Sequence, residues 1–485
     1  MDRRAFLKQG AFTAAGMVLA EKALSGPGPG KKTNIVLMLA DDLGYGDLSC
    51  YGQKRFTTPN LDRVASQGVR FTDFYSGSAV CAPSRCTLMT GLHTGHAPIR
   101  ANTAVVSGEG EKPLPADAMT LPKLLSDAGY CNGAFGKWGL GYPGSEGEPM
   151  KQGFNRFFGY NGQVPAHNYY PRYLWSDDKK IALDGKTYSH DLIMSEAMKF
   201  IRENASRPFF CYLPVTIPHA SLQVPEDSAR PFRKQFPQYE LVPGVYAGPV
   251  IRNPAACFAG MVTRLDGQVG RLMALLAELG IDDRTLFIFT SDNGPHKEGG
   301  AVPDFFDSNG PFRGYKRDLY DGGIRAPFIA RWPGRIPAAG LDNGERGTVS
   351  LPGPGRCCGH VASFWDILAT VCEAAGLATP QGLDGISMLP ALTGDGQDQR
   401  RHEYLYWEFN EKGGQQAVRT GEWKGVRINT KARPAGPVEV YDLSTDIGES
   451  KNLAPVRPEL MDRIAEIMKK AHSEPASTQI LIKGK

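Results

Sequence analysis

The chain has 485 residues, of which 41% are hydrophobic and 22% are charged, and its net charge is only +4. The length predicts one large domain with an appendage, or two to three modest domains. The composition excludes a disordered or collagen-like chain, and the balance of 55 basic and 51 acidic residues argues against a nucleic-acid-binding protein.

The first thirty residues have the features of an export signal. Two adjacent arginines, Arg3 and Arg4, precede a weakly apolar segment at 11–20 that is too short to span a bilayer. Their order resembles a bacterial twin-arginine signal, and an ordinary amphipathic helix is the alternative. A Gly-Pro repeat at 26–30 predicts a linker. We therefore expect an exported protein, periplasmic or extracellular, that uses the twin-arginine route and has no membrane span in its mature form.

Strands and helices alternate after the linker. Residues 258–276 carry apolar side chains on one face, which predicts a helix that ends at Gly280. Four unbroken apolar runs predict strands that are buried on both faces: 34–40, 208–214, 285–290 and 327–332. This alternation predicts an α/β domain with a mainly parallel sheet.

The pattern changes after about residue 395. Short strands separated by Gly, Asn and Asp are predicted at 404–409, 416–419, 423–427 and 438–441. A final helix carries an apolar stripe from Leu460 to Ala471. We expect a small antiparallel sheet with a helix packed on it. The chain then divides into a signal and linker (1–30), a main domain (31–395) and a C-terminal α+β subdomain (396–485).

Oxygen-rich pairs follow two of the predicted strands. Asp41 and Asp42 follow the first strand, and Asp292 and Asn293 follow the strand at 285–290. Ligands bind at the carboxyl ends of strands in open α/β sheets, and adjacent carboxylates repel unless a cation lies between them. Each pair alone is equally consistent with helix caps and turns. Together they form an all-oxygen donor set that predicts Ca²⁺ or Mg²⁺ rather than Zn²⁺.

A cysteine lies where another helix is predicted to begin. Cys81 precedes Pro83, Ser84 and Arg85, and Ser84 is a candidate N-cap. The helix dipole and Arg85 favour an anion here, either a thiolate or an incoming oxyanion. Taken alone, a single cysteine is more often a buried apolar residue than a nucleophile. The nine cysteines include no CxxC pair, which argues against a zinc ribbon or a thioredoxin-like site, and their odd number leaves at least one outside any disulfide set.

The segment 81–91, with Cys-x-Pro-Ser-Arg followed by Thr-Leu-Met-Thr-Gly, resembles the signature of the type I, formylglycine-dependent sulfatases of the alkaline phosphatase superfamily. Further motifs agree in chain order, so that the match runs from about residue 33 to 455: 41–44, 136–138, 218–220, 291–294, 313–316, 322–327, 441–443 and 452–454. The resemblance implies a large, mainly parallel sheet sandwiched by helices, with the catalytic sulfatase domain at 31–395.

The resemblance also implies a modified residue and a metal. Cys81 would be oxidised to formylglycine by a maturation enzyme, and the hydrated aldehyde would supply the nucleophilic oxygen. Calcium would be held by this residue together with Asp41, Asp42, Asp292 and Asn293. A metal at this place lowers the pKa of a bound hydroxyl and holds the sulfate next to the nucleophile.

Three cations and one histidine complete the catalytic set that the resemblance implies. Arg85, Lys137 and Lys316 would surround the sulfate and stabilise the charge that develops on its oxygens. His219, or Lys316, would donate a proton to the departing alcohol. Taken alone, both lysines are typical of a solvated surface, and His219 is equally typical of a core histidine.

One position departs from the family pattern. The family commonly has a histidine two residues after the active-site lysine, and Gly139 stands there in this chain. His167 is the best substitute, although a histidine of a surface loop is an equally good interpretation. His296 and Arg100 are further candidates for binding the substrate, and a role as ordinary polar loop residues is at least as consistent with the sequence.

The predicted activity is arylsulfatase-like hydrolysis of a sulfate ester in a sulfated carbohydrate, as in the degradation of a sulfated polysaccharide. The first alternative is a phosphate or phosphonate ester hydrolase of the same fold. The second is an inactive, sulfate-binding relative. This second alternative is disfavoured because Cys81, Pro83, Arg85 and the predicted metal ligands and lysines occur together.

Overall fold

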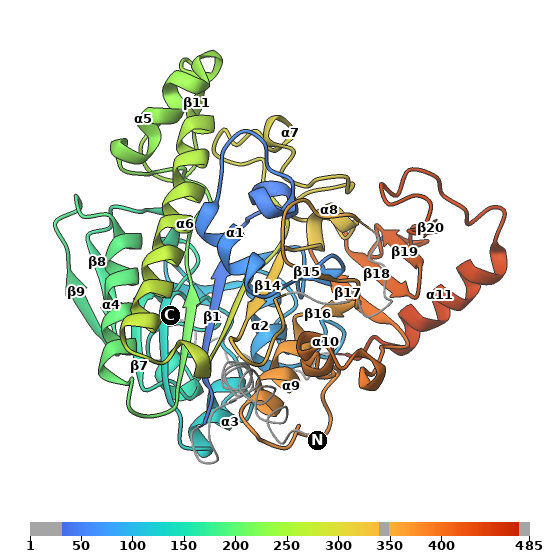
Figure 1. The fold of residues 1–485 in the computed structure, drawn as a ribbon. Coiled ribbons are helices and arrows are strands. Elements are labelled where there is room, and N and C mark those ends of the chain that lie inside the picture. The colour runs from blue at the N-terminus through green and yellow to red at the C-terminus, as the bar shows by residue number, and fades with distance from the viewer. Residues whose placement is uncertain (1–31, 339–348, 475–485) are drawn as a thin grey trace, which may run out of the picture.

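The computed structural model describes residues 32–338 and 349–474 (Figure 1). The predicted export signal and linker at 1–30 lie outside the described residues. In the described part of the chain, no helix is both long and apolar enough to cross a membrane.

A ten-stranded sheet forms the centre of the molecule, in the order β15-β2-β14-β13-β1-β10-β6-β7-β8-β9. Strand β1 (Asn34–Ala40) is completely buried and lies parallel to β10 (Phe209–Pro214) and β13 (Thr285–Ser291). Strands β6 (Cys131–Lys137) and β7 (Arg156–Tyr160) continue the parallel part. The prediction of a mainly parallel sheet built on unbroken apolar strands is confirmed.

Antiparallel strands lie toward both edges of this sheet. On one side β14 (Phe328–Arg331) is antiparallel to β13 and to β2 (Val69–Phe71), and β15 (Arg356–Cys358) is parallel to β2. On the other side β8 (Tyr173–Ser176) and β9 (Lys179–Ala182) are antiparallel. The short two-stranded sheets pair β3 (Phe74–Tyr75) with β16 (Ala362–Ser363), β4 (Ala104–Val106) with β5 (Gly110–Glu111), and β11 (Pro243–Gly244) with β12 (Ile251–Arg252).

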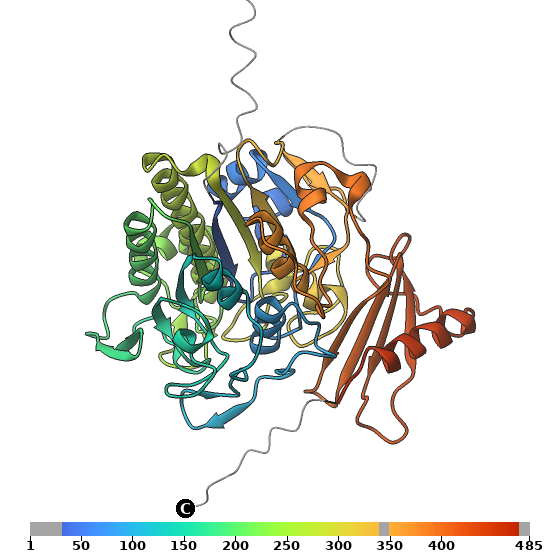
Figure 2. The same ribbon diagram turned by 90° about the horizontal axis from the view of Figure 1, so that it is seen from below.

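Helices cover both faces of the sheet (Figures 1 and 2). Alternate residues of β1 point to opposite faces, so that Val36 and Met38 join one hydrophobic core and Ile35 and Leu37 join the other. Helices α1 (Pro59–Ser66), α4 (Ser189–Glu203) and α6 (Pro254–Glu278) pack in the first core. Helices α2 (Cys81–Thr90), α3 (Leu121–Asp127) and α9 (Trp365–Ala374) pack in the second. The other α-helices before the C-terminal part are α5 (Glu226–Gln235), α7 (Pro303–Phe306), α8 (Asp321–Ile324) and α10 (Leu389–Thr393).

The long helix begins earlier than its apolar stripe predicted. The Asn253 side chain accepts a hydrogen bond from Ala256 N, and Pro254 occupies the first helical position, where it gives up no hydrogen bond. Capping therefore adds a turn before Phe258, and α6 runs to Glu278, close to the predicted end at Gly280.

The C-terminal part forms a separate four-stranded antiparallel sheet, as predicted. It consists of β17 (Leu405–Phe409), β18 (Gln415–Thr420), β19 (Trp423–Ile428) and β20 (Val438–Asp442), and α11 (Pro458–Lys470) packs on one face (Figure 2). The opposite face carries Trp407, which packs against Tyr75 and Trp365 of the main body. The boundary between residues 395 and 396 stays a prediction.

Candidate active site

The two oxygen-rich pairs meet at the carboxyl end of the sheet. Because Ala40 of β1 is level with Ser291 of β13, Asp41 and Asp42 lie beside Asp292 and Asn293. All four side chains are buried. The Asp42 amide donates to Asp292 Oδ1 at 3.1 Å, and Asn293 Nδ2 donates to Asp42 Oδ1 at 2.7 Å. The register of two parallel strands is therefore what assembles this group.

Cys81 lies against this group at the first residue of α2. Its Sγ is 3.4 Å from Asp41 Oδ1, and its side chain is only 1% exposed. The predicted N-cap was wrong, because Ser84 lies inside the helix and its Oγ accepts a hydrogen bond from Gly77 N. One turn after Cys81, Arg85 binds Asp292 Oδ2 through Nη2 at 2.8 Å, and the same nitrogen is 3.4 Å from Asp41.

The surroundings of Cys81 do not favour a thiolate. Burial, and then the Asp41 carboxylate, raise the pKa of the Cys81 thiol well above its usual value despite the nearby Lys137. The sequence left open whether this place favours a thiolate or an incoming oxyanion, and the raised pKa disfavours the thiolate for the unmodified side chain. A neutral, buried thiol is a poor nucleophile.

Two buried lysines neutralise the carboxylates that follow β1. Lys137, the last residue of β6, donates to Asp41 Oδ2 at 2.7 Å, and Lys316 donates to Asp42 Oδ2 at 2.8 Å. Burial alone would raise the pKa of both carboxyls, but these cations outweigh it, so the pKa of Asp42 is about 2 and that of Asp41 is also low. The lysines are thus parts of a buried site, and their alternative as solvated surface residues is excluded.

The donor set fits a hard divalent cation. Asn293 Oδ1 is buried and has no hydrogen-bond partner within the described part of the chain, which is costly unless a ligand satisfies it. The nearby carboxylates of Asp41, Asp42 and Asp292 supply further oxygens, the atoms that Ca²⁺ and Mg²⁺ prefer. Burial and the charge of Asp41 raise the pKa of Asp292, and a cation between these carboxylates would relieve that repulsion.

Three histidines form a stack beside Lys316. His219 Nε2 is 2.9 Å from Lys316 Nζ, and its Nδ1 contacts the carbonyl oxygen of Ala220, so Nε2 carries the lone pair that accepts from the lysine. The His167 ring is stacked with the His219 ring, with centroids 4.7 Å apart. The His296 ring is also stacked with the His219 ring, with centroids 5.7 Å apart. The Tyr169 hydroxyl is 2.7 Å from the backbone oxygen of His219 and fixes this segment. The structure thus brings all three predicted histidines together.

Arg100 is not brought to this cluster. Its guanidinium binds Glu408 Oε1 at 3.0 Å and the Ser473 carbonyl oxygen at 2.6 Å, which ties the segment after α2 to the C-terminal part. The Glu408 carboxylate balances the positive charge of Arg100. The role of Arg100 in substrate binding stays a prediction.

Sequence reasoning missed other side chains near the site. Glu298 is 3.5 Å from Lys316, and the Tyr246 ring lies 5.1 Å from His167. Gly139 is the position that differs from the family pattern. A Cβ atom on Gly139 would lie 2.3 Å from Gln163 Nε2, so the Gln163 side chain occupies the space that a larger residue at position 139 would need. Glu298 follows the predicted metal pair closely in the chain, but no pattern in the sequence marks Tyr246 or Gln163.

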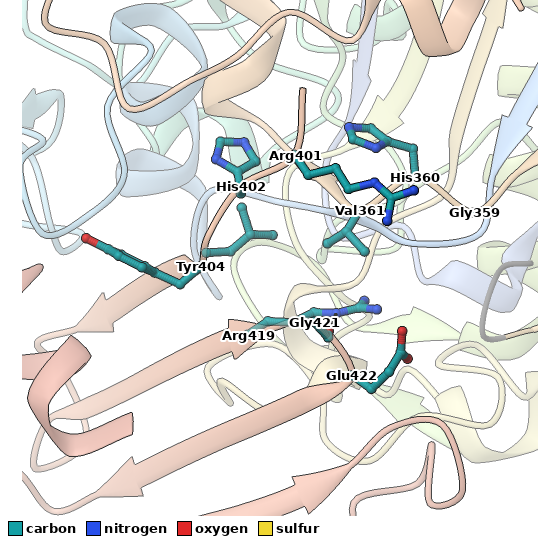
Figure 3. A pocket seen from close by; sticks show the side chains of 10 residues that line it. Gly359, His360, Val361, Arg401, His402, Tyr404, Arg419, Gly421 and Glu422 are labelled. Carbon is teal, nitrogen blue, oxygen red and sulfur yellow. Dashed lines mark hydrogen bonds between the residues drawn. The ribbon is translucent and has the colours of Figure 1, made fainter. Parts of the chain in front are cut away.

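A pocket of about 300 Å³ lies apart from these residues, between the C-terminal sheet and the segment 359–361 (Figure 3). Arg401, Arg419 and Glu422 are among its lining residues. Arg419 is bound to Asp73 at 2.8 Å, so this cavity belongs to the contact between the main body and the C-terminal sheet. None of the predicted site residues lines it.

The fold and the site define an alkaline phosphatase-like ester hydrolase. The family model for Sulfatase matches residues 33–377. Human arylsulfatase A is 33% identical over 471 residues, which cover 90% of this chain and 86% of that protein. N-acetylgalactosamine-6-sulfatase of Canis lupus familiaris is also 33% identical, over 78% of this chain and 69% of its own length. The chain belongs to the sulfatase family and is a sulfuric ester hydrolase.

Solved structures agree with this assignment. The crystal structure of Ps i-CgsB in complex with k-i-k-neocarrahexaose superposes with a TM-score of 0.75 and 27% identity, over 92% of this chain and 94% of that one. The sulfatase PsFucS1 from Pseudoalteromonas sp. has a TM-score of 0.69 at 24% identity and supports the fold. The recognition of the family from sequence motifs is confirmed.

Proposed function

We propose that the protein removes sulfate from a sulfated carbohydrate, with formylglycine at position 81 and Ca²⁺ held by Asp41, Asp42, Asp292 and Asn293. The contact of Cys81 with Asp41 inside a buried cluster of carboxylates and cations carries this proposal. Relatives named for N-acetylgalactosamine 6-sulfate and a relative bound to neocarrahexaose support a carbohydrate substrate. The bound metal and the aldehyde hydrate would together supply an activated oxygen nucleophile at neutral pH.

Side chains of this chain would bind and orient the sulfate. Arg85, Lys137 and Lys316 are buried cations bound to the carboxylates beside Cys81, and such groups stabilise charge that develops on the ester oxygens more strongly in a dry site than in water. Their charges balance the carboxylates of Asp41, Asp42 and Asp292. Adding a divalent cation to this balanced set leaves a positive site, which attracts a sulfate monoanion.

A proton for the departing alcohol would come from the His219–Lys316 pair. The 2.9 Å contact between Nε2 and Nζ lets the lysine proton pass to the histidine, or directly to the alkoxide. His167 covers one face of the His219 ring and keeps it oriented. The His296 ring is also stacked with His219, and we propose that both His167 and His296 line the substrate-binding region.

Maturation and export belong to the same proposal. A formylglycine-generating enzyme would act on Cys81 before or during folding, because this side chain is buried in the folded protein. The arginine pair and apolar segment near the N-terminus support export by the twin-arginine route to the periplasm or beyond.

Mass spectrometry of the peptide that contains Cys81, from protein made in its native cell, tests this function. We expect a loss of mass that corresponds to conversion of the thiol to an aldehyde. Hydrolysis of 4-nitrophenyl sulfate should then exceed that of 4-nitrophenyl phosphate. Finding only the unmodified thiol in active protein would disprove the proposed nucleophile, and preferred cleavage of the phosphate would favour the phosphoesterase alternative.

Removal of calcium is expected to lower both stability and activity. Ca²⁺ that binds only the folded protein adds about 2.7 kcal/mol to the free energy of unfolding at one hundred times its Kd. The thermal midpoint should fall after dialysis against EGTA and recover with Ca²⁺, and Asp292→Asn should abolish this response. An unchanged midpoint and calorimetric titrations without heat would contradict a calcium site.

A further inference from the structure

A groove of about 540 Å³ lies between the loop 107–109 and the segment 164–173. Its volume is within the range of about 300–1,000 Å³ that is typical of small-molecule sites, and it is much larger than one sulfate group requires. None of the residues that line it belongs to the catalytic cluster described above.

The groove reaches the backbone on both sides of His167. Pro165 and Asn168, which flank this histidine, both line the groove. The His167 ring is stacked on His219, with an angle of 8° between the rings. The groove therefore adjoins the chain segment whose histidine is stacked on His219.

The lining of the groove has the mixed character of a carbohydrate site. Val164 is 56% exposed there and offers an apolar surface. The Glu109 carboxylate is already satisfied, because it accepts from the Tyr173 hydroxyl at 2.5 Å and Trp175 Nε1 at 2.6 Å and pairs with Lys180 at 3.2 Å. These contacts fix the Tyr173 side chain and neutralise the negative charge.

Arg172 is left as the available cation of the groove. It is exposed, and its guanidinium makes no hydrogen bond or ion pair with any residue of 32–338 or 349–474. A guanidinium binds sulfate and carboxylate groups through paired hydrogen bonds, which suits an anionic sugar substituent.

We propose that this groove binds the sugar unit next to the one that is desulfated, and that Arg172 pairs with a sulfate or carboxylate on that neighbour. The substrate is then an anionic oligosaccharide or polysaccharide, and a monosaccharide sulfate leaves the groove empty. This inference rests on the proposed function, since the site beside His219 must hold a sulfated carbohydrate.

Competition with 4-nitrophenyl sulfate tests the groove. A carrageenan tetrasaccharide provides only sulfates, a chondroitin 6-sulfate tetrasaccharide adds carboxylates, and galactose 6-sulfate is the monosaccharide probe. Arg172→Gln is expected to raise the inhibition constant of at least one tetrasaccharide about tenfold. The Michaelis constant for the aryl sulfate and the inhibition constant of galactose 6-sulfate should both stay unchanged.

Lys469→Gln is the matched control, because it removes the same charge from exposed surface on α11, at the opposite side of the molecule from β8 and β9 (Figures 1 and 2). If Arg172→Gln leaves both tetrasaccharide constants unchanged, or alters the galactose 6-sulfate constant equally, the proposed subsite is wrong and the proposed function stands. A wild-type enzyme that fails to cleave 4-nitrophenyl sulfate contradicts the proposed function instead. In that case, calorimetric titration with the tetrasaccharides tests the groove without the sulfatase assay, and Arg172→Gln must weaken their binding.

Discussion

Changing Cys81 to alanine is expected to abolish sulfate ester hydrolysis, with a fall in kcat of about 10⁴-fold or more, while the protein stays folded. The side chain of residue 81 lies 3.4 Å from Asp41 and supplies the atom from which the proposed nucleophile is made. Alanine removes that atom and leaves the cations and carboxylates in place. The measurement is the rate of 4-nitrophenyl sulfate hydrolysis, with the circular dichroism spectrum as the check on folding.

Cys86→Ala is the matched control for this variant. Cys86 lies on the same helix and is equally buried, but it packs in the hydrophobic core. Its replacement is expected to cost about 1 kcal/mol of stability and to leave kcat unchanged. If Cys81→Ala retained more than a tenth of the activity, the nucleophile would have to come from elsewhere, and the formylglycine mechanism would be wrong for this chain.

Local patterns were sufficient to predict the centre of the fold. The apolar runs of β1, β10 and β13 are buried on both faces, and placing them at the surface would expose apolar side chains to water. The direction of β14 was not predictable in the same way, because an apolar run indicates burial but contains no information about which way the strand runs. Helix α2 was predicted to begin at Cys81, as it does, but its N-cap was misjudged, since Ser84 Oγ accepts a hydrogen bond from Gly77 N inside the helix instead of capping it.

The site was predictable where strand ends create it. Asp42 and Asn293 meet because each follows a buried strand of matching register. Lys137 is also the last residue of a strand, but only the family resemblance marked it as a site residue. Side chains from loops were harder to assign. Tyr246 reaches His167 only through the tertiary arrangement of its loop, and Arg100 turns to Glu408 of the C-terminal sheet, a partner 308 residues further along the chain.

Lys424 is expected to be the most important side chain for holding the C-terminal sheet on the main body. It is buried on β19, and its Nζ lies 2.5 Å from Asp321 Oδ1 and 3.4 Å from Glu449 Oε1. Asp321 opens α8, whose last residue precedes Arg325, and Arg325 contacts both Asp321 and Asp73. Buried ion pairs therefore connect the two parts of the chain beside the cavity shown in Figure 3.

Lys424→Met is expected to lower the free energy of unfolding by about 3–5 kcal/mol, because within the described part of the chain it leaves the buried Glu449 without a cation and leaves Asp321 with Arg325 alone. The methionine side chain is only one atom shorter than that of lysine, so lost packing contributes little. Lys470→Met is the control, since Lys470 is exposed and only 3.6 Å from the exposed Glu466, an ion pair worth less than about 1 kcal/mol. The midpoint of urea unfolding measures both variants. Equal midpoints would mean that the packing of Trp407 against Tyr75 and Trp365, and not the buried charges, holds the sheet in place.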